Sequence, residues 1–245
     1  KMDQRLITKK AEIREVAAAL CAEGSRQNWS AFWPIMETDL LAHKVKFPLL
    51  EFVAQTLFGC LDDGEQLEVV TKLFGRVEDG SSVVAGKLLQ LRLPLQFAQS
   101  FELAVGGIVA GDTWYHCDHL GERVLGHGLL TNPKGAMPLL SACLHHENSW
   151  VRRGVGVAAH YATKKGLPKP EVEAVLTLLL TGAGSSDYQV QRGVGWGLKT
   201  IAKFYPDLMK TYLVRLPPGG VSQPVMGKIE TGLKTAVFKQ TAAKS

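Results

Sequence analysis

The sequence predicts an all-α protein, built as an α-solenoid of HEAT-like antiparallel helix pairs. One stretch occurs twice: residues 151–156 read VRRGVG and residues 190–195 read VQRGVG, a shift of 39 residues. Both copies open a segment in which apolar residues recur at helical spacing, and alternating strand patterns are nearly absent from the sequence. A helix that recurs at about 40 residues is typical of stacked helix pairs.

Both copies of the repeat carry the signals of a helix start. Each follows a short polar stretch of the kind that caps helices, residues 147–149 and 185–187. Each also has an arginine in its first turn, Arg153 and Arg192. A guanidinium beside the free N–H groups and partial positive charge of a helix start favours an anion rather than a neighbouring helix. We therefore expect these arginines to face an anion.

The N-terminal part of the chain is expected to be helical and to form core. Residues 3–23 are predicted to make one amphipathic helix with Leu6 and Ile13 on its apolar face. The next helix, from residue 25, carries an aromatic stripe, which usually packs in a core; a base-facing role for one of its tryptophans is the weaker alternative. Four more helices without obvious chemistry are predicted over residues 48–61, 65–77, 81–91 and 94–110.

The helix predicted to begin at Trp114 differs from those before it. Trp114 and Asp118 are four residues apart, so they lie on one helix face. A large π-surface next to a carboxylate suits a cation, although an indole at the rim of a core gives the same pattern. In the second repeat copy Trp196 replaces Val157 of the first, which indicates either a specialised role or a wider gap to fill. Further helices are predicted over residues 137–145, 150–164, 170–180, 205–214 and up to about residue 239.

Length and charge bound the domain organisation. At 245 residues the chain could hold two domains, but one repeat favours a single domain over residues 1–245, with acidic helices in 1–110 and basic repeats in 111–245. Residues 1–119 hold 12 Lys and Arg against 16 Asp and Glu (−4), and residues 120–245 hold 16 against 7 (+9). A polyanion is the expected partner of the basic half, and a solubilising surface is the alternative.

The cysteines and the apolar stretches indicate the compartment. Four widely spaced cysteines lie in apolar helical stretches without a Cys-x-x-Cys pair, so we expect them to be reduced and buried: Cys21, Cys60, Cys117 and Cys143. The first helix is too charged for a secretory signal, and no apolar run reaches membrane-spanning length. We expect a soluble, cytoplasmic protein with no membrane partner.

Three separated motifs occur in a recognisable order and spacing. They are Asp112-Thr113-Trp114 with Asp118, Trp150-Val151-Arg152-Arg153, and residues 190–196. Together they resemble the AlkD-like DNA alkylation-repair glycosylases, which are built from HEAT-like helix pairs. The resemblance covers roughly residues 100–215, while the N-terminal third departs from the family pattern, which is reduced there to residues 44–51.

The resemblance implies an activity and a set of site residues. It implies a curved, concave surface that binds duplex DNA, and hydrolysis of the N-glycosidic bond of cationic N3- or N7-alkylated purines by a monomer without metal or organic cofactor. Trp114 and Trp196 match the family's two catalytic tryptophans and Asp118 its catalytic aspartate. Phosphate contacts are expected from one matching arginine and three further basic residues, namely Arg153, Arg152, Arg192 and Lys199.

Two other functions fit parts of the sequence. A non-catalytic HEAT scaffold could bind nucleic acid or an acidic protein, but it has no need for a carboxylate at its polyanion site. A metallohydrolase could use Asp118 with nearby histidines, but no His-Glu-x-x-His set is present. We expect His116 and His119 to be ordinary polar residues and His145-His146 to end a helix. The glycines of the repeat are expected to allow close helix packing.

Overall fold

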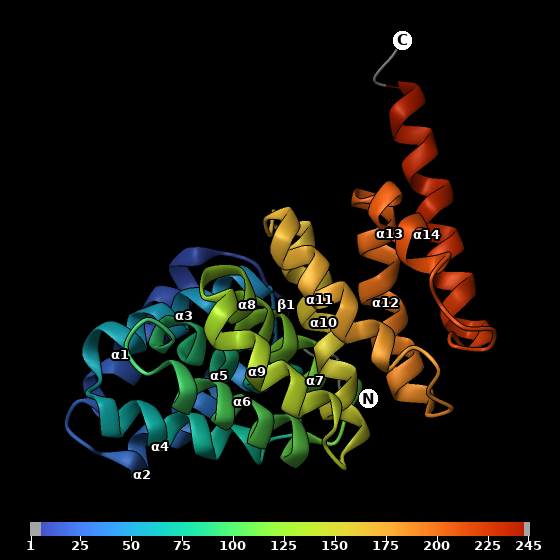
Figure 1. Ribbon diagram of the computed structural model, residues 1–245. Helices are drawn as coiled ribbons and strands as arrows, with labels where there is room; N and C mark the ends of the chain where they lie inside the picture. The colour runs from blue at the N-terminus through green and yellow to red at the C-terminus, as the bar shows by residue number, and fades with distance from the viewer. Residues whose placement is uncertain (1–5, 243–245) are drawn as a thin grey trace. The chain divides into compact units, whose positions relative to one another are not determined.

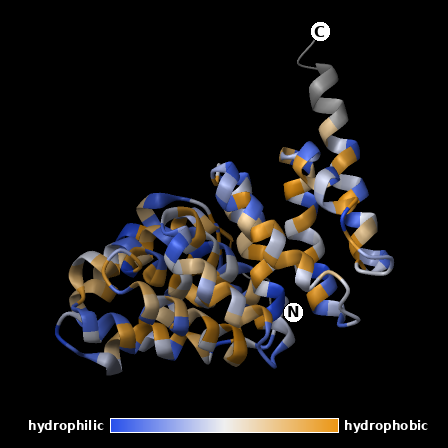
Figure 2. Cartoon of the chain, in the orientation of Figure 1, coloured by the Kyte–Doolittle hydropathy of each residue, from blue (hydrophilic) through white to orange (hydrophobic). Residues whose placement is uncertain are grey.

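The computed structural model describes residues 6–242, with the side chains of residues 6–236. Helices make up most of this part of the chain, which confirms the all-α prediction, and the chain divides into two compact units, Lys1–Gly111 and Asp112–Ser245 (Figure 1). The long helices of both units carry hydrophobic as well as hydrophilic stretches, as expected for helices with one buried face (Figure 2).

In the first unit the helices α1, α3 and α5 pack in succession. Helix α2 packs on α1, α4 packs on α5, and α6 packs on both α4 and α5. The bounds are α1 Lys10–Gly24, α2 Trp29–Ile35 continued by the π-helical turn η1 Met36–Leu41, α3 Phe47–Cys60, α4 Asp63–Phe74, α5 Asp79–Arg92 and α6 Phe97–Gly111. The aromatic stripe of α2 lies in the core as predicted: Phe32 and Trp33 are buried.

The prediction of one helix over residues 3–23 is wrong at its start. Leu6–Ile7 forms a short strand, β1, that pairs in parallel with β2, Lys44–Val45, and helix α1 begins at Lys10. Leu6 is 55% exposed, so it does not belong to the apolar face to which its spacing assigned it. A two-residue strand depends on a partner 38 residues away (44 − 6), and helical spacing alone does not encode that partner.

The prediction for the cysteines holds for two of the four. Cys117 and Cys143 are free and buried. Cys21 and Cys60 are instead joined in a disulfide that links α1 to α3, with their Cα atoms 6.0 Å apart. The expectation of reduced thiols is therefore wrong for this pair, because the packing of α1 on α3 brings two distant cysteines within bonding distance.

The second unit is a stack of helices in two layers. One layer, here called the site layer, contains α7 Trp114–Leu120 with the π-helical turn η2 Gly121–Gly126 and α8 His127–Thr131, then α10 Ser149–Lys164, α12 Tyr188–Phe204 and α14 Gln223–Ala242. Helices α9 Pro133–Leu144, α11 Lys169–Thr181 and α13 Pro206–Leu213 form the second layer. Each of these three contacts the site-layer helices before and after it in sequence, which is the HEAT-like arrangement predicted from the repeat.

Glycines set the close approach of the site-layer helices. A Cβ atom at Gly156 of α10 would collide with the backbone of Gly193 in α12, and one at Gly193 would collide with the backbone of Arg153. The next pair of site-layer helices has a similar contact, because a Cβ atom at Gly232 of α14 would collide with the Lys199 carbonyl of α12. The repeated glycines therefore serve helix packing, as predicted.

Candidate active site

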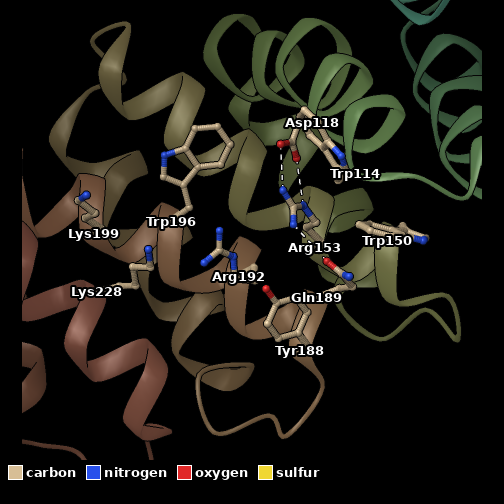
Figure 3. A pocket seen from close by; sticks show the side chains of 10 residues that line it. All are labelled: Trp114, Asp118, Trp150, Arg153, Tyr188, Gln189, Arg192, Trp196, Lys199 and Lys228. Atoms are coloured by element: carbon tan, nitrogen blue, oxygen red, sulfur yellow. Dashed lines mark hydrogen bonds and ion pairs between the residues drawn. The ribbon is translucent and has the colours of Figure 1, made fainter. Parts of the chain in front are cut away.

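The site layer surrounds a cavity of about 570 Å³. Its lining combines aromatic side chains, one carboxylate and basic side chains, drawn from four successive site-layer helices (Figure 3). The lining residues are Trp114, Asp118, Trp150, Arg153, Tyr188, Gln189, Arg192, Trp196, Lys199 and Lys228. All of them belong to the second unit.

Two polar residues fix the helix starts that point into this cavity. The Asn148 side chain accepts hydrogen bonds from the backbone N–H groups of Trp150 and Val151 at the start of α10. Asp187 caps α12 in the same way, by accepting from Gln189 and Val190. These are the helix starts predicted from the polar stretches before each repeat copy. The two repeat copies therefore begin at equivalent points of the structure.

Arg153 and Asp118 form a bidentate ion pair. Arg153 Nε donates to Asp118 Oδ1 at 3.0 Å and Arg153 Nη2 donates to Oδ2 at 2.9 Å (Figure 3). Their side chains are 12% and 17% exposed, so water screens the pair only in part. The expectation that Arg153 faces an anion rather than a neighbouring helix is therefore wrong for the DNA-free protein, because its partner is the carboxylate of the neighbouring helix α7. Asp118 thus has a structural partner, which the sequence pattern did not indicate.

Arg153 also contacts the other sides of the cavity. Its Nη1 donates to Gln189 Oε1 of α12 at 3.1 Å, and its guanidinium lies 5.7 Å from the centre of the Trp150 ring. Trp150 is held in turn, because its Nε1 donates to Asp112 Oδ1 at 2.9 Å. Asp112 adopts a left-handed conformation, with φ of 45°, which aspartate tolerates better than most residues.

Three aromatic side chains stand at helix starts around the cavity. Trp114 is the first residue of α7, Trp150 the second of α10 and Tyr188 the first of α12. Trp114 and Tyr188 are 60% and 65% exposed, which is high for such large apolar rings. Arg192 lies over the Tyr188 ring at 6.0 Å, much as Arg153 lies over Trp150. Exposed aromatic rings beside arginines are a common feature of surfaces that bind nucleic acid.

A cluster of basic side chains forms another part of the lining. Arg192 and Lys199 come from α12 and Lys228 from α14. Partial burial lowers the pKa of Lys228 below its usual range, and the positive charges of Arg192 and Lys199 lower it further. Two cations close enough to disfavour the charge of a third, Lys228, indicate a site for a bound anion.

Trp196 is stacked against a histidine. The His160 ring of α10 lies 4.1 Å from the Trp196 ring, with 25° between the two planes. Burial lowers the pKa of His160 to about 4, and the nearby Lys164 and Lys199 contribute to this shift. His160 is therefore neutral near pH 7. The indole that lines the cavity is covered on one face by an uncharged ring.

The structure brings six of the seven predicted site residues to one cavity. Arg152 is the exception: it does not line the cavity, and its Nη2 donates to Asp187 Oδ2 at 2.9 Å and to Ser149 Oγ at 3.1 Å. Four lining residues were not among the predicted site residues, although the first of them begins the second motif: Trp150, Tyr188, Gln189 and Lys228. The aromatic residue that precedes each first-turn arginine by three or four positions was a usable signal for Trp150 and Tyr188.

The histidines do not form a metal site in the described part of the chain. His116 is buried and its Nδ1 lies 2.8 Å from Thr113 Oγ1. His145 follows α9, as expected of a helix end, and its Nδ1 lies 2.8 Å from the Ser141 carbonyl oxygen. Within residues 6–236, no group of three or more His, Cys, Asp or Glu side chains could hold a metal ion.

None of the helices between residues 6 and 242 combines the length and the apolar character that a membrane span requires.

Comparison with protein families gives one match over most of the chain. The model of a family described as "DNA alkylation repair enzyme" matches residues 12–234. The matched range includes every residue that lines the cavity.

Solved structures with the same fold come from similar proteins. AlkD2 from Streptococcus mutans has a TM-score of 0.64 and 16% sequence identity, over 90% of this chain and 97% of that one. The structure of smu.31 from Streptococcus mutans UA159 has a TM-score of 0.61 and 15% sequence identity, over 87% of this chain and 97% of that one. The Pseudomonas fluorescens alkylpurine DNA glycosylase AlkC, bound to DNA containing an abasic site analog, has a TM-score of 0.57 and 16% sequence identity, over 95% of this chain and 64% of that one. These likenesses show a shared fold.

Proposed function

The chain belongs to the DNA alkylation repair enzyme family, and from that premise we propose that it is a DNA glycosylase acting on cationic N3- or N7-alkylated purines in duplex DNA. The observation that carries the proposal is the cavity in which one carboxylate, two tryptophans and a basic cluster meet: Asp118, Trp114, Trp196, Arg192, Lys199 and Lys228. This set matches the charges of the reaction: the base is cationic, the sugar becomes cationic as the bond breaks, and both lie between anionic phosphates.

Hydrolysis of this glycosidic bond needs little help from a general acid. A purine alkylated at N3 or N7 already carries a positive charge, so the base leaves readily without protonation. What remains is to stabilise the sugar as it becomes oxocarbenium-like and to place a water molecule at its anomeric carbon. One carboxylate can do both, which is the role we assign to Asp118. Neither a metal ion nor an organic cofactor is required for this reaction.

The two tryptophans suit the cationic base and the developing cation on the sugar. The face of an indole ring is negative, and one such contact favours a cation by about 0.5–2 kcal/mol. Trp114 is exposed beside Asp118 on α7, and Trp196 is presented by α12. We assign them to opposite sides of the lesion, which can then remain in the base stack rather than be extruded.

The basic residues would hold the DNA backbone. Arg192, Lys199 and Lys228 would contact phosphates and fix the register of the duplex without reading its sequence. Arg153 would exchange its bond to Asp118 for a phosphate in part of the reaction cycle. A phosphate contact by Arg152 has less support than the sequence predicted, because Arg152 already pairs with Asp187. Because water alone cleaves the bond, the enzyme is a monofunctional hydrolase of base excision repair. We propose that it acts as a monomer.

One observation favours a second candidate, a HEAT protein that binds DNA without chemistry. The bidentate pair with Arg153 gives Asp118 a purely structural reason to be present. A scaffold that binds DNA could therefore carry a carboxylate here to hold Arg153. The two candidates differ in whether Asp118 acts on bound DNA, so base release separates them.

The test is base release from a duplex with one N7-methylguanine, in the absence of added metal, by the parent protein and by Asp118→Asn. Release by the parent and its loss in the variant, with duplex binding retained by both, would support the glycosylase and the role of Asp118. Salt-sensitive binding without release from this duplex or from one with N3-methyladenine would reject the glycosylase in favour of the scaffold.

A further inference from the structure

The stack of His160 on Trp196 is held by a second contact. His160 Nδ1 lies 2.7 Å from Thr200 Oγ1, and Thr200 Oγ1 donates to the Trp196 carbonyl oxygen at 3.1 Å. A hydroxyl has a single hydrogen, so a threonine that donates to the carbonyl must accept from His160. This arrangement places the proton on Nδ1 and fixes the plane of the imidazole ring. Thr200 is one turn after Trp196 on α12, so both partners of His160 belong to one helix.

The stack occupies a position that is filled differently in the first repeat copy. Val157 and Trp196 are equivalent residues, 39 positions apart. Val157 is buried over Gly121, where a Cβ atom would lie 2.9 Å from Val157 Cγ1. Gly121 lies 36 residues before its contact Val157, and His160 lies 36 residues before its contact Trp196, so His160 has the place of Gly121 in the second copy. A small pair buried in the core is thus replaced in the second copy by two stacked rings, one of which lines the cavity.

The stack also matters for charge. An imidazolium ring at 4.1 Å would occupy one face of the indole and repel a cation bound on the other face. Partial burial and the charges of Lys164 and Lys199 disfavour that protonated form, so the pKa of His160 falls to about 4. A neutral ring supports the indole without opposing a cation on its free face.

We propose that His160 is a positioning residue for Trp196: as a fixed, uncharged ring it holds one face of the indole so that the opposite face receives a cationic base. The inference rests on the proposed function for the nature of the ligand, a purine that carries a positive charge. It assigns His160 no contact with the substrate, and it assigns Thr200 the task of orienting the imidazole ring.

The proposal can be tested on the indole itself, without catalysis. The full chain is labelled with 5-fluorotryptophan, and the Trp196 signal is identified among the five tryptophan ¹⁹F resonances by its loss in Trp196→Phe. In His160→Ala and Thr200→Val we expect this resonance to shift or broaden. The cation 7-methylguanosine should shift the Trp196 resonance of the parent more than neutral guanosine does, and this response should fall about threefold or more in His160→Ala.

Matched variants separate positioning from mere packing. His160→Phe keeps a ring against the indole and should restore most of the response to 7-methylguanosine, while His160→Lys, which adds a cation, should not. His145→Ala removes an exposed histidine at the end of α9 and should leave all five resonances unchanged. An unchanged Trp196 resonance in His160→Ala, or equal responses to 7-methylguanosine in that variant and the parent, would overturn the proposal.

Base release then distinguishes this inference from the proposed function. If the parent releases N7-methylguanine, kcat should fall about threefold to tenfold in His160→Ala and recover in His160→Phe. A parent that releases no base but shows the expected Trp196 responses would reject the glycosylase and retain the positioning role. If the parent and His160→Ala release base at the same rate, the glycosylase is retained and the positioning role of His160 is rejected.

Discussion

Arg153 and Asp118 are joined by two parallel hydrogen bonds that link α10 to α7, at 2.9 and 3.0 Å. The same guanidinium reaches Gln189 of α12, so one side chain connects three successive helices of the site layer. The carboxylate to which we assign stabilisation of the cationic sugar is thus balanced by a guanidinium in the DNA-free protein. A phosphate that draws Arg153 away would leave the charge of Asp118 uncompensated at the moment the lesion is bound.

Replacing Arg153 should affect turnover as well as binding. In Arg153→Ala the carboxylate of Asp118 loses the partner that orients it before DNA binds, and bound DNA loses the phosphate contact that replaces this pair, so we expect the rate of base release at saturating protein to fall about tenfold or more. Arg192→Ala is the matched control, because Arg192 has the same place in the second repeat copy but forms no pair with Asp118. It should reduce only the slope of log K against log salt, by about 0.9 for one phosphate contact. Equal effects of the two variants on the release rate would contradict this role.

Lys228 should contribute to DNA affinity, although it was not among the site residues predicted from the sequence. Its side chain lines the cavity with Arg192 and Lys199, and the low pKa caused by burial and by these two cations means that a bound phosphate would relieve their repulsion. Lys228→Ala should therefore weaken binding to undamaged and damaged duplexes alike and reduce the salt slope by about 0.9. Fluorescence anisotropy at several salt concentrations would measure this. Lys234→Ala, on the same helix but outside the cavity, should bind as the parent does.

The sequence predicted those parts of the fold that depend on local chemistry. The starts of α10 and α12 follow from side-chain caps at Asn148 and Asp187, which act within a few residues of themselves. The close packing of these helices follows from glycines that recur with the repeat. In the same way Trp114 and Asp118 share a face because four residues make about one helical turn.

The features that the sequence did not reveal depend on packing between distant segments. The strand at residues 6–7 exists only beside residues 44–45, and the disulfide between Cys21 and Cys60 needs α1 to lie on α3. Lys228 was missed because α14 does not keep the spacing of the repeat: the contact of Gly232 with Lys199 spans 33 residues (232 − 199), whereas the like contact of Gly193 with Arg153 spans 40 (193 − 153). Whether Arg153 faces a phosphate or a carboxylate likewise depends on how α7 packs against α10.

Stability should fall in mild acid because of His119. Burial lowers its pKa from 6.5 to about 4, with help from Arg123 and His116, so between these values the unfolded chain binds a proton that the folded chain does not. The free energy of unfolding should therefore decrease as the pH falls from 6.5 to 4, by about 2–3 kcal/mol from this residue. Urea unfolding at pH 7, 5.5 and 4.5 should show a shallower decline for His119→Gln than for the parent. His145→Gln should decline as the parent does.

The contact between α10 and α12 should tolerate no side chain at Gly156. A Cβ atom there would meet backbone atoms of Gly193, which cannot rotate away, so the two helices would have to separate. We expect Gly156→Ala to lower the free energy of unfolding by about 3 kcal/mol or more, measured by urea denaturation. Gly227→Ala is the control, because Gly227 lies within α14 with no atom within 4 Å of the added Cβ, and it should raise stability by about 0.5–1 kcal/mol. Similar losses in both variants would mean that helix propensity, and not the approach of the two backbones, selects glycine at residue 156. A large loss in Gly156→Ala alone would place the requirement in the contact between α10 and α12, which also brings Gly193 against the Arg153 backbone.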